Sequence, residues 1–261
     1  MSRLYTPSSH SPLASGARRR RGIEDHPVFQ ALPITTRQRI LDTGRLHQRE
    51  SFGPPLEEHE LHFILQGAAG LFPALDDVCV SVVPAGAVHG WERALFPTSP
   101  GPWAVPLVET LLFSVPPASI LDTLGRGWLT RLLALQAQQR LRALEAEVCC
   151  NASHGVLGRL AKWILRLHDE CAGAPLHITQ AQLGRMLGVQ RTSINVAAAR
   201  LQALDLVRFG RARLRILDLA GLRAASCGCS ASAPSASSSA APAPEGRSFL
   251  PPGEGPVLKI I

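Results

Sequence analysis

The stretch from Ile178 to Leu217 constrains the fold of this chain more than any other part of its sequence. Thr179 stands three residues before Gln182, and such a pair can form a capping box at the start of a helix. Gly188 suits the left-handed conformation at which helices often end. A second helical run begins at Arg191, and two short helices joined by a tight Gly turn predict a helix-turn-helix. We expect these helices over 180–187 and 191–204.

A β-hairpin is predicted directly after the second helix. Leu206–Phe209 forms its first strand, Gly210-Arg211 its turn, and Ala212–Leu217 its second strand, in which Arg213 and Arg215 alternate with apolar residues. A hairpin with arginines at its tip, placed behind a helix-turn-helix, is typical of a wing. The small residues Ala197–Ala199 predict that the second helix is slim enough to enter a groove.

The charge is concentrated near the C-terminal end of the chain. Residues 179–229 carry eight arginines against only Asp205 and Asp218, whereas residues 23–178 hold a small excess of acidic residues. A basic module beside an acidic one is the electrostatic footprint of a nucleic-acid-binding protein. A merely solvated basic surface is the alternative. The hydrophobic fraction of 46% excludes a chain that is disordered throughout.

The first half of the chain shows a different pattern, in which short apolar runs are separated by turn residues. The clearest runs are Leu61–Leu65, Val78–Val83 and Glu109–Val115, spaced within the stretch from Arg45 to Val115. Short strands with regular turn signals predict an antiparallel sandwich or barrel. We expect the segment Pro97–Pro106 to be an irregular loop or an edge strand.

A long amphipathic helix is predicted from Trp128 to Val148. Its apolar stripe consists of Leu129, Leu133, Ala137, Leu141, Leu144 and Val148, which lie on one helix face. A narrow stripe favours a partner helix, as in a coiled coil, although packing on the chain's own barrel is the alternative. A second helix is expected from His154 to Cys171, with Trp163 at the edge of its buried face.

The two ends of the chain have low-complexity composition. Residues 1–22 and 230–261 are rich in Ser, Ala and Pro, and we expect a disordered basic arm and a disordered tail. No apolar run reaches the ~18 residues of a membrane span, and no secretory signal pattern is present. We therefore expect a cytoplasmic protein whose six cysteines are reduced.

The run Ile178–Ser193 resembles the helix-turn-helix of Crp/Fnr-type bacterial transcription regulators. Leu206–Arg208 and Ile216–Asp218 resemble the wing of that family, and Cys149–Asn151, Leu160–Trp163 and Cys227–Cys229 resemble a subgroup of it. The resemblance implies an α+β fold with three parts between the arm and the tail. These are a cyclic-nucleotide-binding-like antiparallel β-barrel or jelly roll over 23–125, a dimerisation helix over 126–148, and a winged helix-turn-helix over 149–229.

The resemblance also implies a function. We expect a homodimeric, sequence-specific transcription regulator rather than an enzyme, with a pseudo-palindromic operator in double-stranded DNA and RNA polymerase as partners. Arg191 would open the recognition helix and read bases, and Arg211 and Arg213 would contact phosphates. The expected DNA-binding residues are Thr179, Gln180, Gln190, Arg191, Thr192, Ser193, Asn195, Val196, Arg211 and Arg213.

The part of the expected β-barrel that would bind an effector departs from the family pattern. Cyclic-nucleotide binders of this family carry a Gly-Glu motif followed at a distance by Arg-Ser/Thr. In this chain, Gly86–Glu92 and Gly101–Pro106 resemble the corresponding stretches. Neither segment offers an Arg in the place where a phosphate would need one. No cysteine precedes Cys79, which argues against an N-terminal iron–sulfur cluster. We expect an effector other than a cyclic nucleotide.

Metal or catalytic chemistry is the rival interpretation. His59 and His62, together with His89, could be ligands in a cupin-like metal-dependent enzyme, although residues three apart on a strand point to opposite faces. Cys227 and Cys229 could bind a metal, form a redox pair, or simply end the fold as in the resembled family. Cys149 and Cys150 are adjacent and cannot easily chelate together. We expect no metal site and no catalytic constellation.

Overall fold

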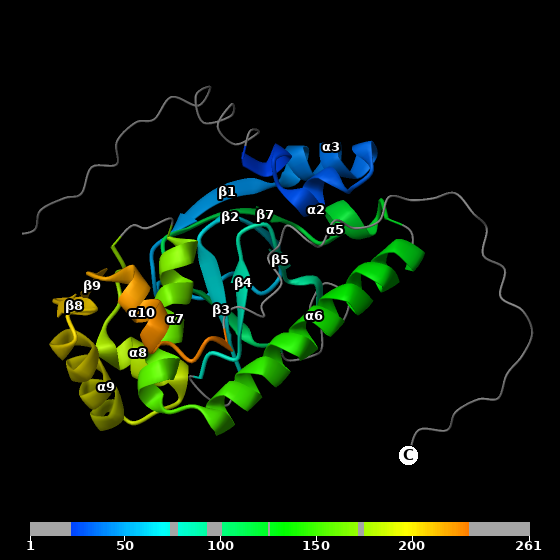
Figure 1. Ribbon diagram of the computed structural model, residues 1–261. Coiled ribbons are helices and arrows are strands. Elements are labelled where there is room, and N and C mark those ends of the chain that lie inside the picture. The colour runs from blue at the N-terminus through cyan, green and yellow to red at the C-terminus, as the bar shows by residue number, and fades with distance from the viewer. Residues whose placement is uncertain (1–21, 74–77, 93–100, 125, 172–174, 230–261) are drawn as a thin grey trace, which may run out of the picture.

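The computed structural model describes residues 22–73, 78–92, 101–124, 126–171 and 175–229 (Figure 1). It shows an N-terminal β domain, one long helix and a C-terminal helical domain with a hairpin, which confirms the predicted α+β class. The predicted tail over 230–261 lies outside the described residues, as does the predicted arm except for Gly22, which is helical.

The β domain consists of two antiparallel sheets that face each other, as the sandwich prediction required. The larger sheet has the order β1 (Arg45–Arg49), β7 (Thr110–Val115), β2 (Leu61–Gln66), β5 (Val88–His89). The smaller sheet has the order β4 (Ser81–Pro84), β3 (Ala68–Phe72), β6 (Trp103–Pro106). Ile64, Leu71 and Leu112 belong to a buried cluster that draws on both sheets.

Most of the predicted strands are present, with one shortened. The apolar runs at Leu61–Leu65 and Glu109–Val115 form β2 and β7, and Trp103–Pro106 is an edge strand of the smaller sheet. The strand expected over 78–83 begins only at Ser81. Its start is displaced because the backbone N–H of Cys79 donates to the carbonyl of Met186 in the C-terminal domain, at 3.1 Å.

Three short helices, which we did not predict from the sequence, cover one side of the larger sheet. They are α2 (Pro27–Gln30), α3 (Ile34–Thr43) and α5 (Ala118–Leu121). Phe29 and Ile40 pack against Phe63 and Phe113 of that sheet in one buried cluster. The start of the described chain is thereby part of the β domain's core.

The long helix α6 (Arg126–Ser153) exceeds the predicted segment Trp128–Val148 at both ends. In Figure 1 it runs as one diagonal ribbon below the sheets, from near α5 to the start of α7. Its predicted apolar stripe divides into two parts. Leu129 is buried and Leu133 partly buried against the β domain's own core, whereas Leu141 is 57% exposed and Val148 66% exposed.

The C-terminal domain is built around α7 (Val156–Glu170). Leu160, Ile164 and Leu167 are buried, and Trp163 is only 2% exposed, so it belongs to the core and not to the edge of the buried face as predicted. The remaining elements are α8 (Gln180–Leu187), α9 (Arg191–Ala203), β8 (Val207–Gly210), β9 (Arg213–Ile216) and α10 (Leu219–Ala225). This core continues into the β domain through residues such as Val82 and Leu107.

Candidate nucleic-acid interface

The helix α8 begins and ends as its sequence predicts. The Thr179 N–H donates to Gln182 Oε1 at 2.8 Å, and the Gln182 N–H donates to Thr179 Oγ1 at 3.2 Å, which completes the capping box. Gly188 ends the helix at φ 62° and ψ 39°. The buried Arg159 donates from Nη2 to the Leu187 carbonyl at 2.7 Å and so satisfies a carbonyl that the helix end leaves open.

The close approach of α8 and α9 explains the glycine within α8. A Cβ on Gly184 would lie 3.3 Å from Cγ1 of Ile194, so a side chain there would press the helices apart. Ile194, Ala198 and Leu201 form the buried face of α9. Ala197 is buried beside them, so Ala197 and Ala198 allow close packing inside the domain and, contrary to the prediction, do not make the exposed face of α9 slimmer.

The outer face of α9 carries the residues that we predicted to recognise DNA bases. Arg191, Thr192 and Asn195 are exposed there, and Val196 is 71% exposed. Gln190 is exposed at the N-cap position, while Ser193 is half-buried. The N-terminal half of α9 therefore presents polar side chains and one apolar side chain to solvent.

The wing is present, with a turn one residue later than predicted. Gly210 pairs with Arg213 in the antiparallel ladder, so the turn residues are Arg211 and Ala212. Ala212 adopts φ 52°, a left-handed conformation that is uncommon for alanine and therefore not predicted from the residue type. The Phe209 N–H donates to Gln202 Oε1 at 2.9 Å and holds the wing against α9.

A cleft between α8, α9 and the wing brings several predicted DNA-binding residues together. Its lining includes Thr179, Gln180 and Ala181 at the start of α8, Arg191 at the start of α9, and Ala212 in the wing. The backbone N–H groups at a helix start favour anions such as phosphate. The Thr179 hydroxyl is engaged in its cap, so its contribution to the cleft is structural.

All eight arginines between residues 179 and 229 are exposed. Five of them were not among the predicted DNA-binding residues, and two of these five lie on the wing. Arg208 and Arg215 face each other directly across the β8–β9 ladder. Like charges in such a pair destabilise a free hairpin, and an external anion would relieve this repulsion. The alternation of the second strand could have indicated Arg215, but its pairing with Arg208 depends on the register.

The segment Gly86–Glu92, which resembles the family's phosphate motif, is held mainly by backbone contacts. The Ala87 carbonyl accepts from the Ile64 N–H at 3.0 Å and lies 3.2 Å from Nε2 of His26. Gly90 has φ 103°, and a Cβ there would lie 2.4 Å from the Glu60 carbonyl oxygen. Trp91 is 1% exposed and fills the core beneath the segment.

The buried histidines of the β domain make contacts within the fold. Nδ1 of His62 lies 2.8 Å from Ser114 Oγ, and its Nε2 lies 2.8 Å from the Glu57 carbonyl. Burial lowers the pKa of His62, and it lowers the pKa of His26 to about 4. Both imidazoles are therefore neutral at pH 7.

The three histidines of the cupin-like alternative do not gather at one point. The rings of His62 and His89 stack with centroids 6.3 Å apart, but His59 is exposed. Within the described ranges, two groups of potential metal ligands lie close together, and neither contains His59 or His89. They are Glu57, Glu60 and His62 in the β domain, and Cys150, Cys227 and Cys229 at the other end of the molecule.

Comparison with known proteins supports the reading of the fold. A sequence model of the Crp-like helix-turn-helix domain matches residues 158–225. No curated protein sequence matches the chain significantly. None of the described helices combines the length and hydrophobicity that crossing a bilayer requires.

Solved structures resemble the chain over most of its length. A crp/fnr-family protein from Eubacterium rectale has a TM-score of 0.60 at 15% identity, covering 76% of this chain and 96% of that one. TTHA1359 of Thermus thermophilus, a CRP/FNR-family transcriptional regulator, has a TM-score of 0.54 at 20% identity, with 69% and 97% covered. The c-di-GMP responsive global regulator CLP of Xanthomonas campestris has a TM-score of 0.51 at 19% identity, with 69% and 97% covered.

These findings define the chain as a protein with a C-terminal winged helix-turn-helix and an N-terminal β domain. Residues 158–225 match the Crp-like helix-turn-helix domain, and the chain has the fold seen in solved structures of Crp/Fnr-family transcription regulators.

Proposed function

We propose that this protein is a homodimeric transcription regulator that binds specific sites in double-stranded DNA. The observation that carries the proposal is the exposed N-terminal face of α9, which lies beside the wing with its exposed arginines and beside a cleft that includes Arg191. Such a face suits the major groove, where side chains at the start of a recognition helix reach base edges.

Within this proposal, different residues supply specificity and affinity. Arg191 can donate two hydrogen bonds to guanine O6 and N7, and Thr192 and Asn195 contact neighbouring bases or phosphates. Arg211 and Arg213 on the wing contact phosphates, and the facing pair Arg208 and Arg215 adds positive charge behind them. The start of α8, with Gln180 in the cleft, binds a further phosphate.

The exposed part of α6 is the proposed dimer interface. Ala137, Leu141, Leu144 and Val148 follow one another at spacings of four, three and four, which is the heptad pattern of a coiled coil. Leu141 and Val148 are more than half exposed in the single chain, so a second copy would bury them. A two-fold dimer places two recognition helices on a pseudo-palindromic operator, with half-sites about one helical turn apart.

The proposal also covers where this regulator acts, which protein it affects and what it senses. It acts in the cytoplasm, where it recruits or blocks RNA polymerase at the promoter, and it catalyses no reaction. The β domain senses an effector other than a cyclic nucleotide. The segment Gly86–Glu92 is held by backbone hydrogen bonds and by the buried Trp91, and it supplies no Lys or Arg side chain that could pair with a phosphate. Calorimetric titration with cyclic AMP and cyclic GMP tests this, and a dissociation constant near micromolar would contradict it.

The decisive experiment is the selection of bound sequences from a pool of random duplex DNA. We expect a two-fold symmetric site, with binding that weakens steeply as salt rises. The matched control is a variant in which Arg191 and Thr192 are both replaced by Ala, which should retain weak binding but enrich no motif. Failure of the unaltered protein to enrich any sequence would reject the proposal.

A further inference from the structure

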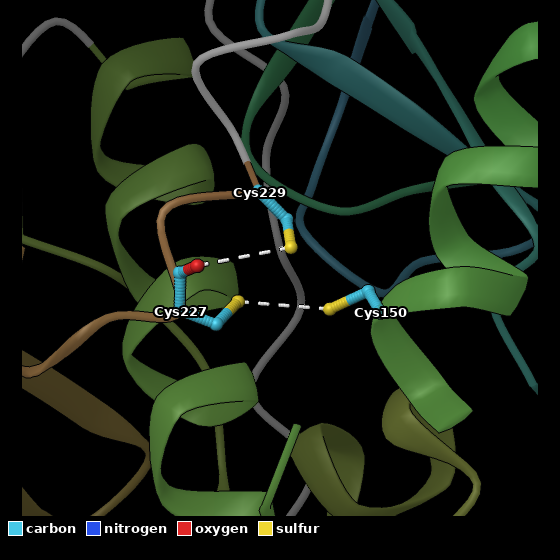
Figure 2. Close-up of side chains that lie close together, drawn as sticks. All are labelled: Cys150, Cys227 and Cys229. Carbon is cyan, nitrogen blue, oxygen red and sulfur yellow. Dashed lines mark hydrogen bonds between the residues drawn. The ribbon is translucent and has the colours of Figure 1, made fainter. Parts of the chain in front are cut away.

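Three cysteines from distant parts of the chain meet behind the DNA-binding domain. Cys150 lies near the end of α6 and is buried, while Cys227 and Cys229 follow α10 and are half-buried. Figure 2 shows their side chains turning toward a common space. The three sulfur atoms all lie within 4.8 Å of one another.

Local features of the chain hold this arrangement in place. Gly228 has φ 71°, a left-handed conformation that bends the chain between the two C-terminal cysteines. The Cys227 N–H donates to the Gly158 carbonyl of α7 at 3.2 Å, and a Cβ on Gly158 would lie 3.5 Å from Cys227 Cβ. The Cys227 segment therefore lies directly against α7 at Gly158.

The distances between the sulfur atoms suit a metal ion better than a disulfide. Cys150 Sγ and Cys227 Sγ are 3.6 Å apart. Thiolates bound to tetrahedral Zn²⁺ at about 2.3 Å have sulfur atoms about 3.8 Å apart, whereas a disulfide needs about 2.05 Å. A metal ion thus fits between these sulfurs with little movement, and the third sulfur needs to shift by about 1 Å at most.

The charges around the cysteines suit a thiolate–metal complex. Lys162 is 3% exposed, and its Nζ lies 3.2 Å from Cys150 Sγ and 2.7 Å from Glu147 Oε2. Arg166 Nη1 lies 3.4 Å from the other oxygen of Glu147. Two cations thus share one carboxylate, which leaves one positive charge. Three thiolates with one divalent cation carry one negative charge, which would balance it.

We propose that Cys150, Cys227 and Cys229 form a three-thiolate binding site for a soft divalent cation of the Zn²⁺ class. The fourth coordination position is open to water or another small ligand. Lys162 positions and neutralises the Cys150 thiolate. The site goes beyond DNA binding and does not depend on it.

The placement of these ligands gives the site a structural consequence. Cys150 precedes the Crp-like domain of residues 158–225, and Cys227 and Cys229 follow it. A bound cation would join the two ends of this domain and fix it to α6. Because such a site does not exist in the unfolded chain, metal binding adds to the stability of the folded state.

The test uses the full-length protein, reduced with a non-thiol reductant and freed of metal with a chelator. We expect titration with Co²⁺ to give one equivalent per chain, with intense tetrahedral d–d bands and sulfur-to-cobalt charge-transfer absorption, and Zn²⁺ to displace it. Zn²⁺ at about 100 times its dissociation constant should raise the melting temperature by about 5–10 °C. Zn²⁺ should also protect three thiols per chain from alkylation.

Variants assign the ligands and exclude a general effect of thiols. Replacing Cys150, Cys227 or Cys229 singly by Ser should weaken metal binding at least tenfold, whereas Cys149→Ser, at an exposed neighbouring position, should leave it unchanged. Circular dichroism of the metal-free variants checks that each still folds. Three results would overturn the proposal: no metal bound by the reduced protein, equal binding by Cys150→Ser, or a Cys150–Cys227 disulfide formed in air by a protein that binds no metal.

Discussion

Residues 179–229 of the C-terminal domain and the core of the β domain place ionisable side chains in opposite environments. In the C-terminal domain, all eight arginines beyond residue 179 are exposed to solvent. In the β domain, His26 and His62 are 3% and 0% exposed; Nε2 of each ring lies against a backbone carbonyl, and Nδ1 of His62 lies against Ser114. Exposed charges remain available to a ligand, whereas buried neutral imidazoles stabilise the fold. The helix α6 joins the two domains and shows both behaviours along its length.

The largest effect is expected where α6 leaves the β domain. Leu141→Glu combined with Leu144→Glu would bury two unpaired charges against a second copy, so we expect a monomer whose operator affinity falls about 100-fold or more. Light scattering and gel-shift titration measure this. Gln139→Glu with Ala146→Glu is the matched control, because both positions are exposed and lie off the heptad stripe. A double Leu variant that stays dimeric would rule out this interface.

The second prediction concerns Arg191, one of the exposed arginines of the C-terminal domain. Arg191→Ala should reduce affinity for the selected operator about 5- to 150-fold, because a bidentate contact to guanine is worth about 1–3 kcal/mol. Base preference at one position of each half-site should relax, while binding to unrelated DNA should change little. Equal losses on specific and unrelated DNA would identify Arg191 as a phosphate contact instead.

The third prediction concerns His26, one of the buried histidines of the β domain. Because the pKa of His26 in the folded protein is about 4, against 6.5 as its ordinary value, the unfolded chain takes up the proton first as the pH falls. Stability is therefore fully present above pH 6.5 and lost between pH 6.5 and 4. We expect the free energy of unfolding to fall by about 2 kcal/mol from pH 7.5 to 5 through this residue.

Urea unfolding at the two pH values measures this loss, and His26→Gln is the control. The Gln side chain can still donate to the Ala87 carbonyl but does not titrate, so its variant should lose less stability on acidification. An identical pH dependence in both proteins would mean that other groups, such as His62, cause the effect.

The smallest effect is expected at the wing. Arg211→Ala should weaken binding to all DNA sequences a few-fold and reduce the slope of log affinity against log salt by about one unit. Arg223→Ala, which removes an exposed arginine on α10 outside the wing, should leave the slope unchanged. A change in base preference upon Arg211→Ala would move this residue from the phosphate-binding group to the base-reading group.

The features that could be predicted from the sequence are those that local chemistry determines. The capping box at Thr179, the left-handed Gly188 and the buried face of α9 all follow from residues within four positions of each other. The turn of the wing was predicted one residue too early, because Ala212 takes a conformation that is usually adopted by Gly or Asn. Each cross-strand partner is therefore displaced by two residues from the prediction.

The remaining features depend on contacts between distant residues. The stripe of α6 shows that one face is apolar, but periodicity does not say that Leu129 packs on the β domain while Leu141 stays exposed. The meeting of Cys150 with Cys227 spans 77 positions, and no local pattern encodes it. The pairing of Arg208 with Arg215 likewise depends on a register that was predicted incorrectly.

The turn of the helix-turn-helix has a consequence for how related sequences can vary. Gly188 is left-handed, and a Cβ there would lie 3.0 Å from Cγ2 of Val78 in the β domain. Two independent constraints therefore act on one position, one from its own backbone and one from a neighbour 110 residues earlier in the chain. Asn best tolerates this conformation, and it fits at position 188 most easily where residue 78 is smaller than Val. We therefore expect positions 78 and 188 to covary in an alignment of close homologues, and independent variation would show that the side chain at residue 78 can move aside.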